Sequence, residues 1–188
     1  MPWANGRGIT HEVMASPNSE DWDWRLSIAE VAEDGPFSVL PGVDRILVVA
    51  TGNGITLDIA GTSHKLKRFD KLHFVGESET VGELTNGPIY DVNLMVKRDR
   101  SIGEPRVDIK LLDRNEPISF EDFPNFVALV VLEGAINIST SGSGFPFNPV
   151  KTRAARLDAI LPETPGQDKL VSLRAAAVAS AVAVISVG

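Results

Sequence analysis

The 188-residue chain contains no cysteine, and this absence excludes several kinds of chemistry. Without thiols it forms no disulfide, no thiolate metal site and no cysteine nucleophile. It also has only three histidines, His11, His64 and His73, and no two of them are close in sequence. Because first-row transition metals favour imidazole and thiolate ligands, we expect no bound metal and no other cofactor.

Clustered basic residues and long apolar runs are also lacking. The formal net charge is −7, and no patch of Lys and Arg is available to bind nucleic acid or a membrane surface. The uncharged stretch Ala175–Gly188 is too short to cross a bilayer as a helix, and the N-terminus has no signal-peptide pattern. We therefore expect a cytoplasmic protein with neither a nucleic-acid nor a membrane partner.

Short apolar segments are abundant, and 16 glycines and 12 prolines separate them. Long segments with a helical period are scarce, which predicts an all-β fold. The alanine-rich segment Arg174–Ala183 is ambiguous between helix and strand, and Ser119–Phe123 favours one short turn. We expect strands at Ile9–Met14, Arg25–Val31, Arg45–Val49, Ile55–Ile59, Lys71–Val75, Tyr90–Lys97, Val127–Leu132, Ala135–Ser139, Leu157–Leu161, Leu170–Ala175 and Val182–Val187.

Two parts of the chain resemble each other. The segment "LVVATGNGITLDI" from Leu47 and the segment "LVVLEGAINISTS" from Leu129 each contain an apolar strand, a glycine turn and a second strand. Each is followed by a related segment, "FDKLHFVGE" from Phe69 and "LDAILPETPG" from Leu157. This repeat indicates two stacked β-sandwich or barrel units, and chance similarity between two hairpins is the alternative.

Three of the expected strands alternate polar and apolar residues, so each places a small polar set on one face. On an outer face such a set is ordinary solvation, whereas inside a barrel it forms a polar pocket that needs a partner. The sequence pattern does not choose between these two alternatives. The paired polar residues are Thr10 with Glu12, Arg25 with Ser27, and Asp91 with Asn93.

Other motifs give weaker signals. The segment "SGSGF" (Ser141–Phe145) has the glycines and serines of a hydrolase motif in the wrong order, which favours a flexible loop. The glycines of "PWANGRG" precede the strand-like "ITHEV" rather than a helix. A phosphate cradle is therefore disfavoured, and Asn5-Gly6 is typical of a tight turn.

The segment "PWANGRGITHEV" resembles the N-terminal signature of the HutD/Ves family, P-W-K-N-G-G-G-x-T-x-E-I. Three further segments agree with the family in order: "DWDWRLSIAEVAEDGPFSVLPGVDR" (Asp21–Arg45), "ILVVATGNGITL" and "PIYDVNLMVKR" (Pro88–Arg98). The resemblance covers about the first hundred residues strongly, and the second half only as a generic cupin-like repeat. Ala4 and Arg7 replace the family's Lys and middle Gly, and a strand that precedes this motif in the family is expected to be missing.

The resemblance implies a metal-free bicupin over residues 1–188, with halves 1–110 and 111–188 between which strands are exchanged. It further implies a bacterial protein linked to histidine utilisation that binds a small carboxylate similar to N-formylglutamate, as a regulator or sensor. The residues carried over as ligand-binding candidates are Trp3, Asn5, Gly6, Gly8, Thr10, Glu12, Trp24, Arg25, Ser27, Phe37, Ser38, Arg45, Asp91 and Asn93.

Most of the candidate residues have an expected role. Arg25 or Arg45 pairs with the ligand carboxylate, because guanidinium groups bind carboxylates bidentately. Hydroxyl and amide side chains supply neutral hydrogen bonds, and aromatic rings form the apolar wall. The structural alternatives are that Trp24 and Phe37 belong to the core and that Asp44 and Arg45 form a turn-stabilising pair. The neutral donors and acceptors are Asn5, Thr10, Ser27, Ser38 and Asn93, and the wall is Trp3, Trp24 and Phe37.

Two other functions compete with the carboxylate sensor. One is a metal-free cupin enzyme, an isomerase or hydrolase acting on a formyl-amino acid, with Glu12 and Asp91 as acid/base candidates. The other is an interaction module in which the apolar run Ala175–Val187 pairs two copies of the chain as a homodimer.

Overall fold

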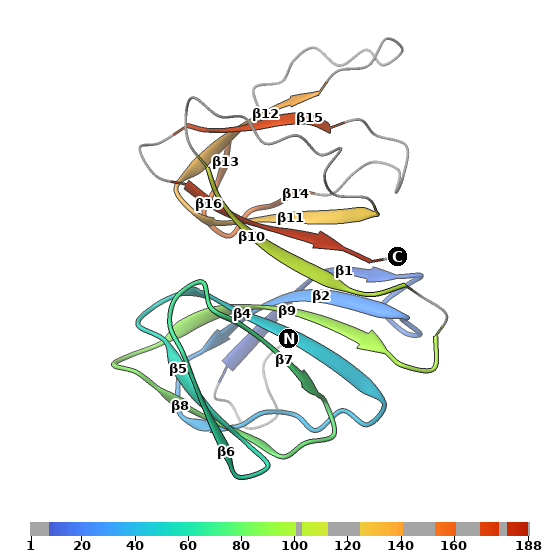
Figure 1. Cartoon of the computed structure of the whole chain (residues 1–188), viewed down its shortest axis with the longest axis vertical. Coiled ribbons are helices and arrows are strands. Elements are labelled where there is room, and N and C mark those ends of the chain that lie inside the picture. Colours follow the sequence, from blue (N-terminus) through green and yellow to red (C-terminus); the bar gives the residue numbers. More distant parts are fainter. Residues whose placement is uncertain are drawn as a thin grey trace. The chain divides into compact units, whose positions relative to one another are not determined.

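The computed structural model describes residues 8–100, 103–112, 125–140, 153–160, 170–176 and 180–187. Every regular element in these ranges is a β-strand, which confirms the predicted all-β fold (Figure 1). Among the same residues, no helix has the length and hydrophobicity needed to cross a membrane. The chain divides into two compact units, unit 1 at Met1–Ile102 and unit 2 at Gly103–Gly188.

Unit 1 contains two antiparallel sheets. The first sheet has the order β1-β2-β9-β4-β7, and the second has the order β3-β8-β5-β6. The strands of the first sheet are β1 (Gly8–Ser16), β2 (Trp24–Val31), β9 (Ile89–Lys97), β4 (Val43–Thr51) and β7 (Lys71–Val75). Those of the second are β3 (Gly35–Pro36), β8 (Thr80–Leu84), β5 (Ile55–Ile59) and β6 (Thr62–Leu66).

The two sheets of unit 1 pack face to face around one apolar core. Leu47, Val49 and Ile89 of the first sheet belong to the same cluster as Ile55 and Leu57 of the second. These five side chains have no exposed surface. Full burial of a large aliphatic side chain stabilises the folded state by about 1.5–3 kcal/mol, so this core fixes which face of each strand points inward.

Unit 2 is also built from antiparallel strands. The strand β16 (Ser180–Ser186) lies between β10 (Arg106–Leu112) and β11 (Phe126–Glu133), and all of its residues are buried. The short β14 (Ala159–Ile160) adds to the free edge of β11. A separate sheet has the order β13-β12-β15, with bounds Arg153–Ala155, Ala135–Thr140 and Leu170–Ala175.

Most predicted strands are present. Ile55–Ile59, Lys71–Val75 and Leu170–Ala175 match β5, β7 and β15 residue for residue. Apart from Leu157–Leu161, the others agree within two residues at each end. Leu157 instead lies in a turn with φ of +69°, so the strand there is only β14.

The alanine-rich segment Arg174–Ala183 is extended in its described parts, as the end of β15 and the start of β16. Its helix alternative is therefore wrong for those residues, because β16 is held by partners on both sides and buries a β-branched core. Five strands were not predicted from the sequence: β3, β6, β8, β10 and β13. The segments Ser119–Phe123, Ser141–Phe145 and Pro2–Arg7 lie outside the described residues.

Candidate functional site

A set of polar side chains crosses the inner face of the first sheet of unit 1. Ser27 on β2 is the register partner of Asn93 on β9, and Met95 lies between Arg25 on β2 and Arg45 on β4. Because alternate residues of a strand share a face, Asp91 lies on the same face as Asn93. We call Arg25, Ser27, Arg45, Asp91 and Asn93 the inner polar set.

The inner polar set is buried. The exposed fraction is 0% for Asp91, 1% for Ser27, 2% for Asn93 and 4% for Arg45, and Arg25 is half-buried. The core residues Leu47 and Val49 lie on the same face of β4 as Arg45. For these strands, therefore, the polar alternation belongs to the interior and is not a solvated outer surface.

Arg45 is held in place by polar and aromatic contacts. Its Nη2 donates to Asn93 Oδ1 over 2.9 Å, and its Nη1 donates to the backbone oxygen of Ser38 over 3.5 Å. The guanidinium carbon lies 5.0 Å from the ring centre of Phe74 and 5.5 Å from that of Phe37. These cation–π contacts and hydrogen bonds leave the Arg45 side chain little freedom to turn.

Asn93 connects Arg45 to Asp91. While its Oδ1 accepts from Arg45, its Nδ2 donates to Asp91 Oδ1. The three side chains thus form one hydrogen-bonded series that runs from β4 to β9 and then along β9. Such a series orients each member through the next, so the free oxygen of Asp91 is also fixed in position.

Four buried atoms of this set have no hydrogen-bond partner in the described part of the chain: Arg25 Nε, Ser27 Oγ, Arg45 Nε and Asp91 Oδ2. An unpaired buried polar atom costs about 1–3 kcal/mol, and most such atoms in folded proteins are paired. Two of the four are nitrogen donors, the hydroxyl can donate or accept, and the carboxyl oxygen accepts when ionised. This face therefore has the unused hydrogen-bonding capacity expected of a ligand site.

Burial controls the charges in this site. It raises the pKa of Asp91 to about 7, although the Arg45 charge and the Asn93 hydrogen bond act in the opposite direction. Burial also lowers the pKa of Arg45, a shift that Asp91 opposes and Arg25 reinforces. Arginine stays protonated in proteins. The inner polar set thus holds two guanidinium groups and a single carboxyl group, and this excess of positive charge suits an anion.

The remaining candidates of the first sheet lie around this set. Thr10 is half-buried on β1, and the exposed Glu12 on that edge strand accepts a 2.5 Å hydrogen bond from Ser19 Oγ. Trp24 is buried on the opposite face of β2 from Arg25, so the structure does not bring it to the set. Gly8 is the buried first residue of β1.

The other two described candidates, Phe37 and Ser38, come from the loop between β3 and β4. Phe37 belongs to the core cluster, as the core alternative expected, and it also contacts the guanidinium of Arg45. Its role as the wall of a ligand site stays a prediction. Ser38 is exposed, and its backbone oxygen accepts from Arg45. Trp3, Asn5 and Gly6 lie outside the described residues.

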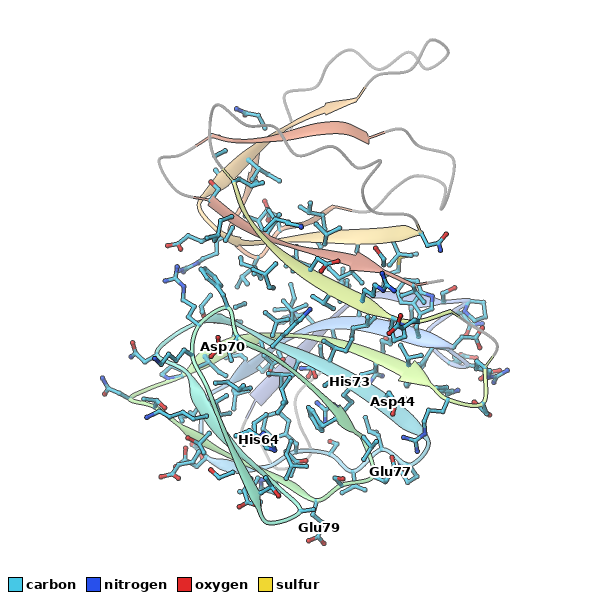
Figure 2. The ribbon with its side chains drawn as sticks, in the orientation of Figure 1. Asp44, His64, Asp70, His73, Glu77 and Glu79 are labelled. Carbon is cyan, nitrogen blue, oxygen red and sulfur yellow. The ribbon has the colours of Figure 1, made fainter. Side chains whose placement is uncertain are left out.

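Asp44 does not pair with Arg45. It lies on the opposite face of β4, where Arg98 Nη1 donates to its Oδ1 over 2.8 Å and Arg98 Nη2 donates to Glu77. Figure 2 shows Asp44 and Glu77 at the same end of unit 1. The turn-pair alternative is therefore wrong, because strand alternation points the two neighbouring side chains to opposite faces.

An open depression lies beside this ion pair, lined by Pro41, Gly42, Val43, Lys97, Arg98 and Asp99. Its two cations already have partners, since Arg98 pairs with Asp44 and Glu77, and Lys97 pairs with Asp21 over 3.0 Å. The depression therefore offers less unused bonding capacity than the inner polar set.

Two residues of the site were not predicted from the sequence. Arg25 Nη2 donates to Met95 Sδ over 3.4 Å, and Phe74 flanks Arg45. Met95 follows Asp91 and Asn93 at alternate positions, so extending that pattern by two residues would have found it. Phe74 is recognised only once β7 is paired with β4.

The described residues contain no group of three or more His, Asp or Glu side chains placed to hold a metal ion. His64 on β6 and His73 on β7 belong to different sheets (Figure 2). The inner polar set instead offers nitrogen donors, which suit an anion rather than a cation.

Known proteins are similar to this chain in sequence and in fold. Protein Ves of Cronobacter sakazakii is 43% identical over 107 residues, 56% of this chain and 59% of that protein. An uncharacterised 21.2 kDa protein from the hutC 3′ region of Pseudomonas putida is 40% identical over 103 residues, 53% of this chain and 54% of that protein. The matched part of this chain thus spans a little over half the length of these curated relatives.

Solved structures match over the whole chain. A conserved protein of unknown function from Pseudomonas aeruginosa superposes with a TM-score of 0.82 at 26% identity, covering 100% of this chain and 92% of the other. HutD from Pseudomonas fluorescens gives a TM-score of 0.74 at 23% identity, covering 100% and 91%.

A cupin 2 conserved barrel domain protein from Leptotrichia buccalis gives a TM-score of 0.59 at 12% identity, covering 96% of this chain and 89% of the other. At this identity the likeness concerns the fold alone, which is cupin-like. The sequence model of the HutD family matches residues 1–179. The chain therefore belongs to the HutD family.

Proposed function

We propose that the interior of unit 1 binds a small carboxylate similar to N-formylglutamate, without a metal, and that the protein acts as a sensor or regulator in bacterial histidine utilisation. The observation that carries the proposal is the set of four unpaired buried atoms around Arg45 and Asp91. A carboxylate has two oxygens that accept several hydrogen bonds, which matches the free Nε atoms of Arg25 and Arg45.

Charge supports a carboxylate over a neutral ligand. Burial lowers the pKa of Arg45, and the nearby charge of Arg25 adds to this shift, so an anion beside the two guanidinium groups stabilises their charged forms. The rings of Phe37 and Phe74 and the thioether of Met95 supply apolar contacts for the carbon chain of the ligand. A few fixed polar groups in an apolar lining are typical of a small-molecule site.

The sensor role rests on the family and its relatives. One relative is named for its place beside hutC in Pseudomonas putida, and one similar structure is HutD of Pseudomonas fluorescens. The described residues hold no group placed to bind a metal ion, and the hydroxyl of the inner polar set, Ser27 Oγ, has no hydrogen-bonded base among them; both observations favour binding over turnover.

Calorimetric titration with N-formyl-L-glutamate at pH 7 tests the proposal. We expect one ligand per chain, with Arg25→Met and Arg45→Met each weakening binding about tenfold or more, because a charge-assisted hydrogen bond contributes about 1.5–3 kcal/mol. Arg98→Met is the matched control and keeps wild-type affinity. Arg98 is ion-paired with Asp44 and Glu77, on the face of the first sheet opposite to the inner polar set. Equal affinity in all four proteins, or no binding by the wild type, would refute the proposal.

A metal-free enzyme is the second candidate, and the pKa of Asp91 favours it. A carboxyl group with a pKa of about 7 is suited to proton transfer at neutral pH. If this candidate holds, purified protein treated with a chelator converts N-formyl-L-glutamate to glutamate and formate, and Asp91→Asn abolishes the conversion. Glu12→Gln separates the two acid/base candidates, because Glu12 is exposed and bonded to Ser19.

A further inference from the structure

The unpaired oxygen of Asp91 presents a conflict to any bound anion. Oδ1 of this carboxyl group is used by Asn93, while Oδ2 is buried and has no partner in the described part of the chain. If Asp91 is ionised, Oδ2 is a negatively charged acceptor and repels a ligand oxygen beside it. If Asp91 is protonated, the same atom becomes an O–H donor and joins the two free Nε donors.

We propose that Asp91 takes up one proton from solvent when an oxyanion ligand binds beside Arg25 and Arg45. This inference rests on the proposed function, and it concerns how that site is regulated. The proton goes to Oδ2, whose O–H then donates to a ligand oxygen. No bond of the ligand changes, and the proton returns to solvent when the ligand leaves.

Few other titratable groups lie on this inner face. Arg25 from β2 and Arg45 from β4 carry guanidinium groups, a class of side chain that stays protonated in proteins. Glu12 from β1 is exposed and bonded to Ser19, and Lys97, at the far end of β9, is bonded to Asp21. From the second sheet, His64 on β6 is half-buried opposite the core residue Leu57.

The remaining described strands of unit 1 contribute no titratable group to this face. The inward residues of β5, β7 and β8 are apolar or small, represented by Ile55, Phe74 and Gly82. Among the described residues of this face, Asp91 is therefore the fully buried carboxyl group. Burial already raises the pKa of Asp91 to about 7, so both of its forms are populated near neutral pH.

Proton uptake by Asp91 on ligand binding determines how the affinity for the ligand changes with pH. Proton uptake on binding means that affinity rises as pH falls, by about tenfold per pH unit above the pKa of the free site. Below that pKa, Asp91 is already protonated and the affinity becomes constant. A sensor of this kind responds to acidification and to its ligand together.

Calorimetry counts the proton directly. Wild-type protein is titrated with N-formyl-L-glutamate at pH 6, 7 and 8 in HEPES and in Tris, which differ in ionisation enthalpy. We expect uptake of close to one proton per ligand at pH 8 and much less at pH 6. The Asp91→Asn variant shows no uptake and a dissociation constant independent of pH, whereas His64→Gln retains the uptake.

A carbon-13 NMR titration of the Asp91 carboxyl group in the wild type gives the same answer without a variant. Its midpoint is expected to move up by about two pH units or more when N-formyl-L-glutamate is bound. If the ligand binds without proton uptake and the midpoint of the Asp91 titration does not move, this inference alone is overturned. If N-formyl-L-glutamate does not bind at any of the three pH values, the proposed function is overturned, and this inference with it.

Discussion

Arg45 and Asn93 are joined diagonally across the β4–β9 pair. The hydrogen bond from Arg45 Nη2 to Asn93 Oδ1 measures 2.9 Å, although the register partner of Asn93 is Leu47 and that of Arg45 is Met95. The Arg45 charge and the Asn93 hydrogen bond both act on Asp91, one alternate position further along β9. These interactions make the inner polar set one electrostatic unit.

Removing Arg45 is expected to destabilise the protein most at alkaline pH. In Arg45→Met, an ionised Asp91 stays buried without an opposing charge, and such a broken buried pair costs about 3–5 kcal/mol. At pH 5.5 Asp91 is protonated, so the loss is smaller. Urea unfolding of the wild type and the variant at pH 5.5 and 8 measures both losses.

The double variant Arg45→Met/Asp91→Asn is the control for this prediction. It removes both charges, so its free energy of unfolding should recover at pH 8 relative to Arg45→Met alone. An equal loss in Arg45→Met at both pH values would contradict a charge-based cause.

The pKa of Asp91 predicts how stability varies with pH. Because its folded value of about 7 lies above the ordinary 3.8, the folded state binds this proton more tightly than the unfolded state. The resulting stabilisation is complete below the ordinary value and is lost as pH rises through about 7. Its size is on the order of a few kcal/mol, at about 1.4 kcal/mol per pH unit.

Thermal and urea unfolding of ligand-free protein between pH 5 and 8 measure this loss. The Asp91→Asn variant should lack this decline, since its amide does not titrate. Asp21 and Glu77 have lowered pKa values, caused first by hydrogen bonds from Lys97 and Arg98 respectively, so their contributions are lost only at more acidic pH. A wild type and variant with parallel pH profiles would show that Asp91 is not the group responsible.

A side chain at Gly82 on β8 is expected to destabilise the folded state. A Cβ at this position would lie 2.7 Å from Phe37 Cε2 and 2.8 Å from Ile55 Cδ1. Gly82→Ala should lower the free energy of unfolding by about 1–3 kcal/mol, as overpacking does, and weaken ligand binding by displacing the ring beside Arg45. Urea unfolding and calorimetry measure the two effects.

A second substitution checks the cause of the Gly82→Ala effect. In Gly82→Ala/Phe37→Leu, the smaller side chain makes room for the new methyl group. The double variant should therefore be less destabilised than the sum of the two single variants. Additive losses would indicate that Gly82 and Phe37 do not interact.

The sequence predicted the strands whose apolar residues alternate or run together, because burial against one core imposes that pattern. It missed β6 and β8, "TSHKL" and "TVGEL", because Leu66 is the one apolar residue of β6, and β8 buries Thr80 while it exposes Val81. These strands exist because β5 offers a partner on each side. Such pairing is a tertiary effect that local composition does not reveal.

The site was predicted in part for the same reason. Alternation placed Asp91 with Asn93 and Arg25 with Ser27, but it left open whether those faces point inward or outward. The direction follows from the second sheet, whose core residues Ile55 and Leu57 cover that face. The register that brings Arg45 to Asn93 depends on strands far apart in sequence, so no local pattern predicts it. The proposed homodimer through Ala175–Val187 stays a prediction.

A crystal structure of the complex with N-formyl-L-glutamate tests the central claim most directly. We expect a ligand carboxylate inside unit 1, within hydrogen-bonding distance of Arg25 Nε and Arg45 Nε, with Asp91 Oδ2 beside a ligand oxygen. A ligand bound elsewhere, for example in the depression beside Arg98, with the inner polar set unchanged, would contradict the account.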